Sequence, residues 1–117
     1  MAMLIKVIAR FVDQATKKPL FGDDYTAKLY DHDVVNDDFI GESRLDKDGR
    51  AEILASLNAA ASMDSPLEAY PDLYFALHGK NGMVFESRVF KDVDFLGKDE
   101  VSGEHRSITR DLGTFEV

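Results

Sequence analysis

The residues most able to do chemistry in this sequence are the carboxylates of one short acidic segment, residues 31–38. It reads Asp-His-Asp-Val-Val-Asn-Asp-Asp, which places four Asp and one Asn within eight residues. Calcium takes roughly six to eight oxygen ligands, and carboxylates clustered on a loop supply such oxygens. A divalent cation would also relieve the repulsion between like charges. The segment therefore predicts a calcium site with the ligands Asp31, Asp33, Asp37 and Asp38.

The same segment also has a plain structural explanation. Asp and Asn are common turn formers, because their side chains hydrogen-bond to nearby backbone groups. The chain has 22 Asp and Glu against 14 Lys and Arg, a net charge of −8, so many carboxylates must be solvated. An EF-hand starting at Asp31 does not fit, because Val35 and Asn36 stand where that loop needs an oxygen ligand and a glycine. A solvated turn is therefore the main interpretation, and calcium binding is the alternative.

Patterns typical of catalysis are missing from the sequence. The chain has no Gly-x-Ser-x-Gly elbow, no Gly-rich phosphate loop and no cysteine. The three histidines are widely separated: His32, His78 and His105. We therefore expect a non-enzymatic binding or interaction module without a cofactor. Calcium binding is the alternative function, and a small hydrolase with an unrecognised site is the third hypothesis.

The length and composition exclude several other classes of protein. The chain has 117 residues, of which 44% are hydrophobic and 31% charged, as expected for one folded domain spanning residues 1–117. No stretch approaches the roughly 18 apolar residues of a transmembrane helix, and the acidic balance argues against nucleic acid. Lys6 and Arg10 interrupt the first apolar run, so no signal peptide is visible. A complete chain would therefore be expected in the cytoplasm.

The elements that position the acidic segment are expected to be strands, because apolar residues alternate with polar ones along most of the chain. Strands are predicted over residues 5–12, 25–30, 39–45, 51–54, 72–78, 83–90 and 106–117. Asp48-Gly49 and Asn81-Gly82 predict hairpin turns. The alanine-rich residues 55–63 predict one short helical insert. This pattern is typical of an all-β, antiparallel sandwich of seven to eight strands.

The first connection resembles that of transthyretin-like, or prealbumin-like, sandwich domains, which tend to show Asp-x-x-Thr-x-x-Pro-Leu-x-Gly and then a strand ending in Leu-x-Asp. The matching residues are Asp13, Thr16, Pro19, Leu20, Gly22, Leu29 and Asp31. The resemblance implies the sandwich fold more than any activity. The related hydroxyisourate hydrolases end in Tyr-Arg-Gly-Ser, whereas this chain ends in Thr-Phe-Glu-Val. Their activity is therefore not implied here.

The acidic segment also resembles a loop of the calcium- and phospholipid-binding sandwich domain found in protein kinase C and synaptotagmin. That loop carries Asp-x-Asp and then Asp-Phe-(Ile/Met)-Gly-Glu, and residues 38–42 read Asp-Phe-Ile-Gly-Glu. The resemblance implies that Asp31, Asp33 and Asp38 are calcium ligands. Membrane docking through calcium is less favoured, because the sequence shows no basic cluster to face the lipid.

The expected partner is a protein or a second copy of the chain. Several aromatic residues fall in loops or on the outward phase of a strand: Tyr30, Tyr70, Tyr74 and Phe90. An exposed aromatic patch would mark a protein interface. Sandwiches also leave edge strands that must be covered, so self-association through an edge strand is the second expected mode of binding.

Overall fold

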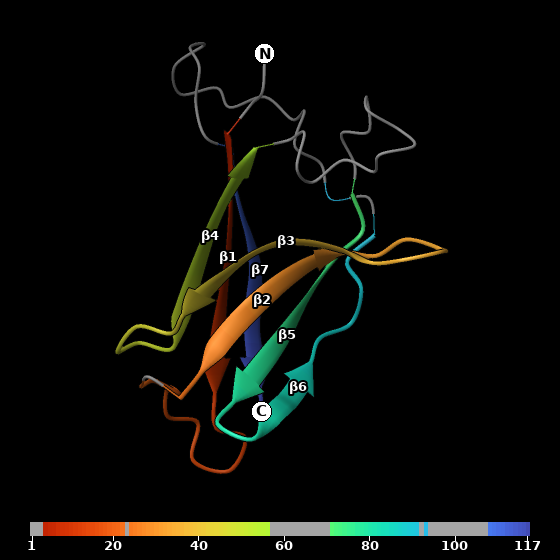
Figure 1. Cartoon of the computed structure of the whole chain (residues 1–117). Coiled ribbons are helices and arrows are strands. Elements are labelled where there is room, and N and C mark those ends of the chain that lie inside the picture. Colours follow the sequence, from red (N-terminus) through yellow and green to blue (C-terminus); the bar gives the residue numbers. More distant parts are fainter. Residues whose placement is uncertain (1–3, 23, 57–70, 92, 94–107) are drawn as a thin grey trace.

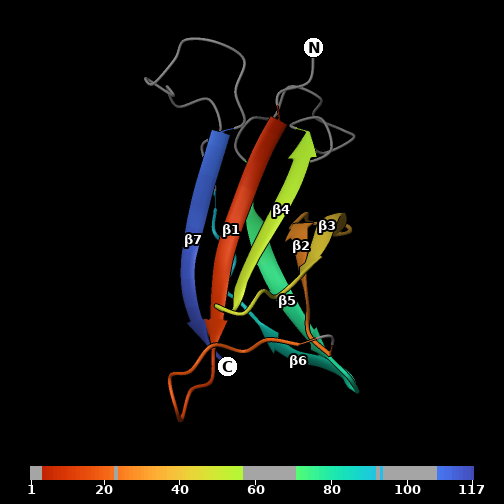
Figure 2. The ribbon, with the colours of Figure 1, turned by 90° about the vertical axis from the view of Figure 1, so that its left-hand side faces the viewer.

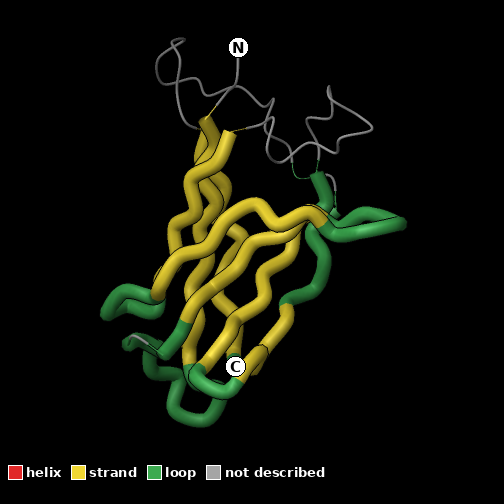
Figure 3. The backbone as a smooth tube through the Cα atoms, viewed as in Figure 1, coloured by secondary structure: helices red, strands yellow, loops and turns green. Residues whose placement is uncertain are grey.

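The chain folds into a β-sandwich, as predicted. The structure is a computed structural model, and it describes residues 4–22, 24–56, 71–91, 93 and 108–117 (Figure 1). All regular elements in these residues are strands, as Figure 3 shows by colour. They are β1 (Leu4–Val12), β2 (Thr26–Asp31), β3 (Asp38–Arg44), β4 (Arg50–Ser56), β5 (Leu73–Gly79), β6 (Gly82–Glu86) and β7 (Ile108–Glu116). None of the described segments forms a helix long and apolar enough to span a membrane.

The strands form two sheets that pack face to face. A three-stranded sheet has the order β4-β1-β7, which Figure 2 shows side by side, and a four-stranded sheet has the order β3-β2-β5-β6. Four strand pairs are antiparallel, but β1 and β7 run parallel. The alternation of apolar residues identifies a strand without setting its direction. A strand from the far end of the chain, with no hairpin joining it to β1, can therefore pair with β1 in parallel.

Two sequence expectations on the third and fourth strands need correction. Asp48-Gly49 does not close a hairpin, because β3 and β4 belong to different sheets and the turn carries the chain across the sandwich. The expected helical insert at residues 55–63 does not begin at Ala55. Ala55 and Ser56 continue β4 opposite Ile5 and Leu4, so pairing with β1 overrides the helix propensity of alanine. Residues 57–63 lie outside the described part of the chain.

The core lies between the sheets and consists mainly of every second residue of the strands, the ones that face inward. At most 2% of each of these residues is exposed: Ile5, Val7, Ala9, Phe11, Ala27, Leu29, Ala51, Ile53, Leu73, Phe75 and Leu77. From β7, Leu112 and Phe115 pack against this core. The ring of Phe11 contacts three other rings, those of Phe75, Phe85 and Phe115, and so joins β1 to the facing sheet.

The strand expected over residues 83–90 is shorter than predicted. β6 ends at Glu86, and the hydroxyl of buried Ser87 then accepts the Phe75 amide N–H at 2.9 Å in place of a backbone carbonyl. Pairing with β5 resumes at Phe90, which bridges to Leu73. The predicted hairpin at Asn81-Gly82 is confirmed, since β5 and β6 pair antiparallel up to Gly79 and Gly82.

Candidate functional site

The acidic segment consists of the last residue of β2, the first residue of β3 and the loop between them. β2 ends at Asp31, β3 begins at Asp38, and residues 32–37 form the connection, which we call the β2–β3 loop. In Figure 1 this loop extends well beyond the sheets, at the end of the sandwich where β2 finishes and β5 begins. The loop is the most protruding described segment at that end. Its side chains therefore meet solvent, or a partner, before the sheets do.

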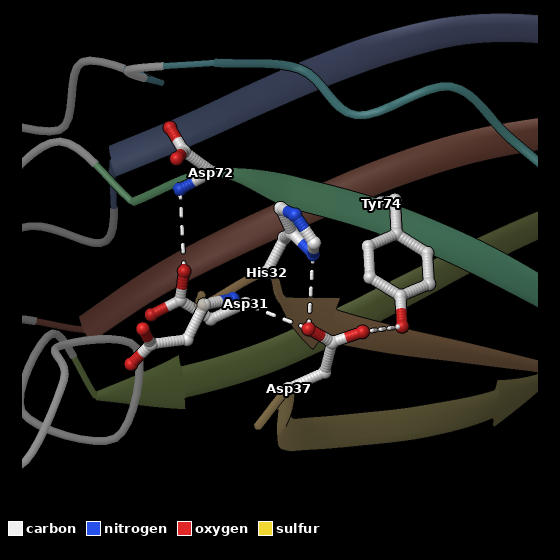
Figure 4. Close-up of polar contacts among 6 residues, drawn as sticks. Asp31, His32, Asp37, Asp72 and Tyr74 are labelled. Carbon is white, nitrogen blue, oxygen red and sulfur yellow. Dashed lines mark hydrogen bonds and ion pairs between the residues drawn. The ribbon is translucent and has the colours of Figure 1, made fainter. Parts of the chain in front are cut away.

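Asp37 holds the loop together through three hydrogen bonds (Figure 4). Its Oδ1 lies 2.9 Å from Nδ1 of His32 and accepts the backbone N–H of Asp33 at 3.1 Å. Its Oδ2 accepts the hydroxyl proton of Tyr74, which comes from β5, at 2.5 Å. The Tyr74 hydrogen bond lowers the pKa of Asp37, and the bonds from Asp33 and His32 act in the same direction. Burial and the hydrogen bond to Asp37 raise the pKa of the Tyr74 hydroxyl.

Asp31 has a different task from Asp37. It is only 4% exposed, and its Oδ1 accepts the backbone N–H of Asp72 at 3.2 Å. The next amide, that of His32, donates to the Asp72 carbonyl at 2.6 Å. These contacts fix the end of β2 to the start of β5. Figure 4 shows the Asp31 and Asp37 carboxylates directed at different donors, so the base of the loop is braced at two points.

The predicted calcium ligands are near one another in sequence but do not converge on one point. The carboxylates of Asp31 and Asp37 accept hydrogen bonds from protein donors. Asp38 is the first residue of β3, and its backbone lies opposite that of Asp31. Asp33 is partly buried and contributes its amide to Asp37. Within the described residues, no group of three or more acidic or histidine side chains is placed to hold a metal ion. Calcium binding stays a prediction, and it would require these side chains to converge on one point.

The two described histidines, His32 and His78, lie far apart. His32 is in the loop, whereas His78 pairs with Thr26 at the opposite end of the four-stranded sheet. His105 lies outside the described residues. The Asp37–His32 pair resembles the carboxylate–imidazole contact that orients a catalytic or metal-binding histidine. The hydroxyl of Tyr74 donates to the same Asp37 carboxylate, so both Asp37 and Tyr74 serve to hold the loop in place.

The sequence analysis missed the apolar tip of the loop. Val34 is 97% exposed and Val35 is 81% exposed, so both side chains stand almost wholly in water. The sequence did contain a sign of this tip, which is two consecutive valines inside an acidic turn. A turn that is only solvated consists of polar residues, whereas valine is usually buried. The structure shows that they are the most exposed large apolar residues among those described.

An aromatic strip continues from the loop onto the outer face of the four-stranded sheet. Tyr30 stacks on Tyr74 with ring centroids 5.3 Å apart, and Phe39 contacts Tyr30 edge-on at 5.7 Å. Phe39 is 53% exposed, Tyr30 is half-buried and Tyr74 is buried. Of the other aromatics expected at the surface, Phe90 is half-buried and Tyr70 lies outside the described residues. The exposed part of the strip therefore lies beside the loop.

Replacing Asp37 with Asn should loosen the loop and lower the free energy of unfolding by about 1 kcal/mol at pH 7, since it weakens three hydrogen bonds near the surface. The folded-state pKa of Asp37 lies below the ordinary 3.8, so the carboxylate stabilises the fold above that pH. This contribution is lost as pH falls through the lowered pKa. Thermal unfolding of both proteins from pH 7 to pH 3 should show the difference shrinking at the acidic end. A difference that is constant with pH, or equal to that of Asp24→Asn, would contradict this role.

Comparisons with known proteins add one structural likeness. A scan against protein-family models finds no match, and neither does a search of curated proteins. The structure is similar to that of a 9R-lipoxygenase from Cyanothece PCC8801, with a TM-score of 0.58 and 26% sequence identity. The match covers 98% of this chain and 16% of the lipoxygenase chain. The chain is therefore similar to one small part of that enzyme, and the resemblance to transthyretin-like domains stays a prediction.

Proposed function

We propose that this chain is a non-enzymatic binding module that docks on a lipid–water interface through its β2–β3 loop. The observation that carries the proposal is the exposure of Val34 and Val35, at 97% and 81%. Moving one such side chain fully out of water contributes roughly 1.5–3 kcal/mol. A protruding pair suits a soft interface that can close around it, whereas a protein partner would need a matching pocket.

The bracing of the loop supports this function, because it lowers the entropy lost on docking. Asp37 joins both ends of the loop to Tyr74, and Asp31 anchors β2 to the start of β5. The valines are therefore presented on a connection that is already ordered by hydrogen bonds. A flexible loop with the same apolar residues would lose more of their binding free energy in becoming ordered.

The charge around the tip indicates which lipids it would meet. Residues 31–43 contain no Lys or Arg, and the whole chain has a net charge of −8. Anionic headgroups would be repelled, with a range set by salt screening. Half-exposed Phe39 and the neighbouring carboxylates are instead compatible with the cationic end of a zwitterionic headgroup. The surface thus suits phosphatidylcholine better than phosphatidylserine.

The likeness to the lipoxygenase is compatible with this proposal. The name of that enzyme denotes oxygenation of lipids, and the matched region is only 16% of its chain. A region of that size is more consistent with a module beside a catalytic part than with the catalytic part itself. The transthyretin-like resemblance belongs to the same proposal of a binding module. Asp13, one of the residues that carry this resemblance, forms a turn in which its Oδ1 accepts hydrogen bonds from the backbone N–H groups of Ala15 and Thr16.

Flotation with phosphatidylcholine vesicles in the presence of EDTA tests the proposal. Replacing Val34 and Val35 with serine should weaken vesicle binding by roughly 100-fold, about tenfold for each side chain. Leu54→Ser is the matched control, because Leu54 is 63% exposed on β4, away from the loop, and should bind like wild type. Failure of the wild-type chain to float would overturn the proposal, as would equal losses in the serine variant and the control.

The same assay separates the calcium alternative. If calcium bound to Asp31, Asp33, Asp37 and Asp38 were the docking element, binding would appear only with calcium and would favour phosphatidylserine. Asp33→Asn should then abolish it. Under the proposal made here, binding occurs without calcium and falls as phosphatidylserine replaces phosphatidylcholine.

A further inference from the structure

The rings of Tyr30 and Phe39 form an open corner at the base of the β2–β3 loop. Tyr30 precedes the last residue of β2, and Phe39 follows the first residue of β3. Their ring centroids lie 5.7 Å apart, and the ring planes are inclined by 64°. Tyr74 stacks on Tyr30 from the neighbouring strand β5, with centroids 5.3 Å apart, and so holds the Tyr30 ring in place. The two inclined rings therefore stand as two walls, and Phe39 is 53% exposed.

Negative charge dominates around this corner. Asp37 lies on the same face of the sheet, because it accepts the hydroxyl proton of Tyr74, whose ring belongs to the same cluster. Residues 31–43 contain no Lys or Arg. The nearest basic residue along β2 is Lys28, which lies opposite Glu42 in the strand pair, so the carboxylate of Glu42 offsets its charge. A cation is therefore the kind of ligand that complements this surface.

The cation that suits the corner is one without N–H groups. A metal ion needs several convergent oxygens, and the described residues contain no such group of acidic or histidine side chains. A primary ammonium needs hydrogen-bond acceptors, and the carboxylate of Asp37 already takes part in three hydrogen bonds within the protein. A quaternary ammonium, whose charge is spread over its methyl groups, is instead bound by the faces of aromatic rings.

We propose that the Tyr30–Phe39 corner binds the trimethylammonium group of a phosphatidylcholine headgroup. This inference rests on the docking function proposed above, and it assigns the headgroup that the loop selects. Phe39 follows Val35 by four residues, which is at most about 14 Å of extended chain. The polar layer of one leaflet is roughly 5–8 Å thick. The corner can therefore contact headgroups while the valines at the tip reach the acyl boundary.

Vesicles of phosphatidylcholine and of digalactosyldiacylglycerol, compared in the presence of EDTA, test the proposal, because the second lipid is uncharged and has no ammonium group. The wild-type chain should bind phosphatidylcholine about fivefold more tightly, as expected for an exposed cation–π contact. Phe39→Leu keeps an apolar side chain without a ring and should bind both kinds of vesicle equally. Phe21→Leu is the matched control, because Phe21 is 62% exposed in the connection before β2, and it should keep the wild-type preference.

Tetramethylammonium tests the corner without a membrane. At concentrations up to about 0.2 M it should shift the ring proton resonances of Tyr30 and Phe39, as expected for a millimolar dissociation constant. tert-Butanol, which is of similar size but neutral, should leave them in place at the same concentration. Phe39→Leu should remove the shift of the Tyr30 resonances.

Three results would each overturn the proposal: equal binding of the wild-type chain to the two kinds of vesicle, a preference that Phe39→Leu retains, and ring shifts that are as large with tert-butanol. Equal flotation with both kinds of vesicle would remove this inference and leave the docking function standing. No flotation with either kind would overturn the docking function as well, so the two failures are distinguishable.

Discussion

Phe11→Ala should lower the free energy of unfolding by about 3–5 kcal/mol, the largest effect expected for a single side-chain truncation in this chain. Phe11 is 0% exposed, and its ring centroid lies 5.5 Å from that of Phe115, 5.9 Å from that of Phe75 and 6.2 Å from that of Phe85. The variant would lose the burial of the ring and leave a cavity between the sheets. For a domain of this length the midpoint should fall on the order of 15 °C.

Phe39→Ala is the matched control for this measurement, since it truncates the same side chain on the outer face, where 53% of it is exposed. It should lower the free energy of unfolding by about 1 kcal/mol, from lost contact with Tyr30. Urea unfolding of both variants measures the difference. Equal losses would show that the ring cluster does not hold the sheets together.

Gly49→Ala should be the second strongly destabilising change, at about 3 kcal/mol. Gly49 has φ +76°, and an added Cβ would clash with the Phe11 carbonyl oxygen while lying 3.2 Å from Leu20 O and Pro19 Cβ. The backbone cannot easily move away, because the Phe11 amide donates to Gly49 O at 2.8 Å. Positive φ and the clash with backbone therefore both oppose a side chain here.

Gly22→Ala separates these two causes. Gly22 also has positive φ, +116°, but an added Cβ would meet no atom within 4 Å. This variant should lose only the conformational part, about 1–2 kcal/mol. Because φ +116° suits an L residue less well than φ +76°, the extra loss of Gly49→Ala in thermal unfolding is a lower bound on the contribution of the clash. A loss for Gly49→Ala no larger than that for Gly22→Ala would contradict the expected contribution of the clash.

The strands were predictable because each needs only local information. Alternation at Ile5, Val7, Ala9 and Phe11 requires a strand with one buried face, and Asn81-Gly82 requires a tight reversal. The sequence did not indicate which neighbouring strand each strand would pair with. Turn residues at Asp48-Gly49 reverse the chain but do not determine which sheet the next strand joins. Alternation likewise leaves open the parallel pairing of β1 with β7.

The candidate site was predictable in place but not in arrangement. The acidic residues marked the loop between β2 and β3, and the structure places it there. The partner of Asp37 is Tyr74, which is 37 residues away, and that contact follows from the alignment of β2 with β5 rather than from any local motif. The aspartates drew attention to metal chemistry, whereas the exposed atoms at the tip belong to Val34 and Val35.

Tryptophan fluorescence gives the most direct test of the central claim, that the tip of the β2–β3 loop enters a lipid–water interface. The chain has no tryptophan, so Val35→Trp introduces a single reporter at the tip and Leu54→Trp introduces one on β4. With phosphatidylcholine vesicles and EDTA, the Val35→Trp emission should shift to the blue and become protected from acrylamide, because the indole leaves water. The Leu54→Trp emission should not change. Val35→Trp emission that stays unshifted while the protein floats with the vesicles would contradict the account.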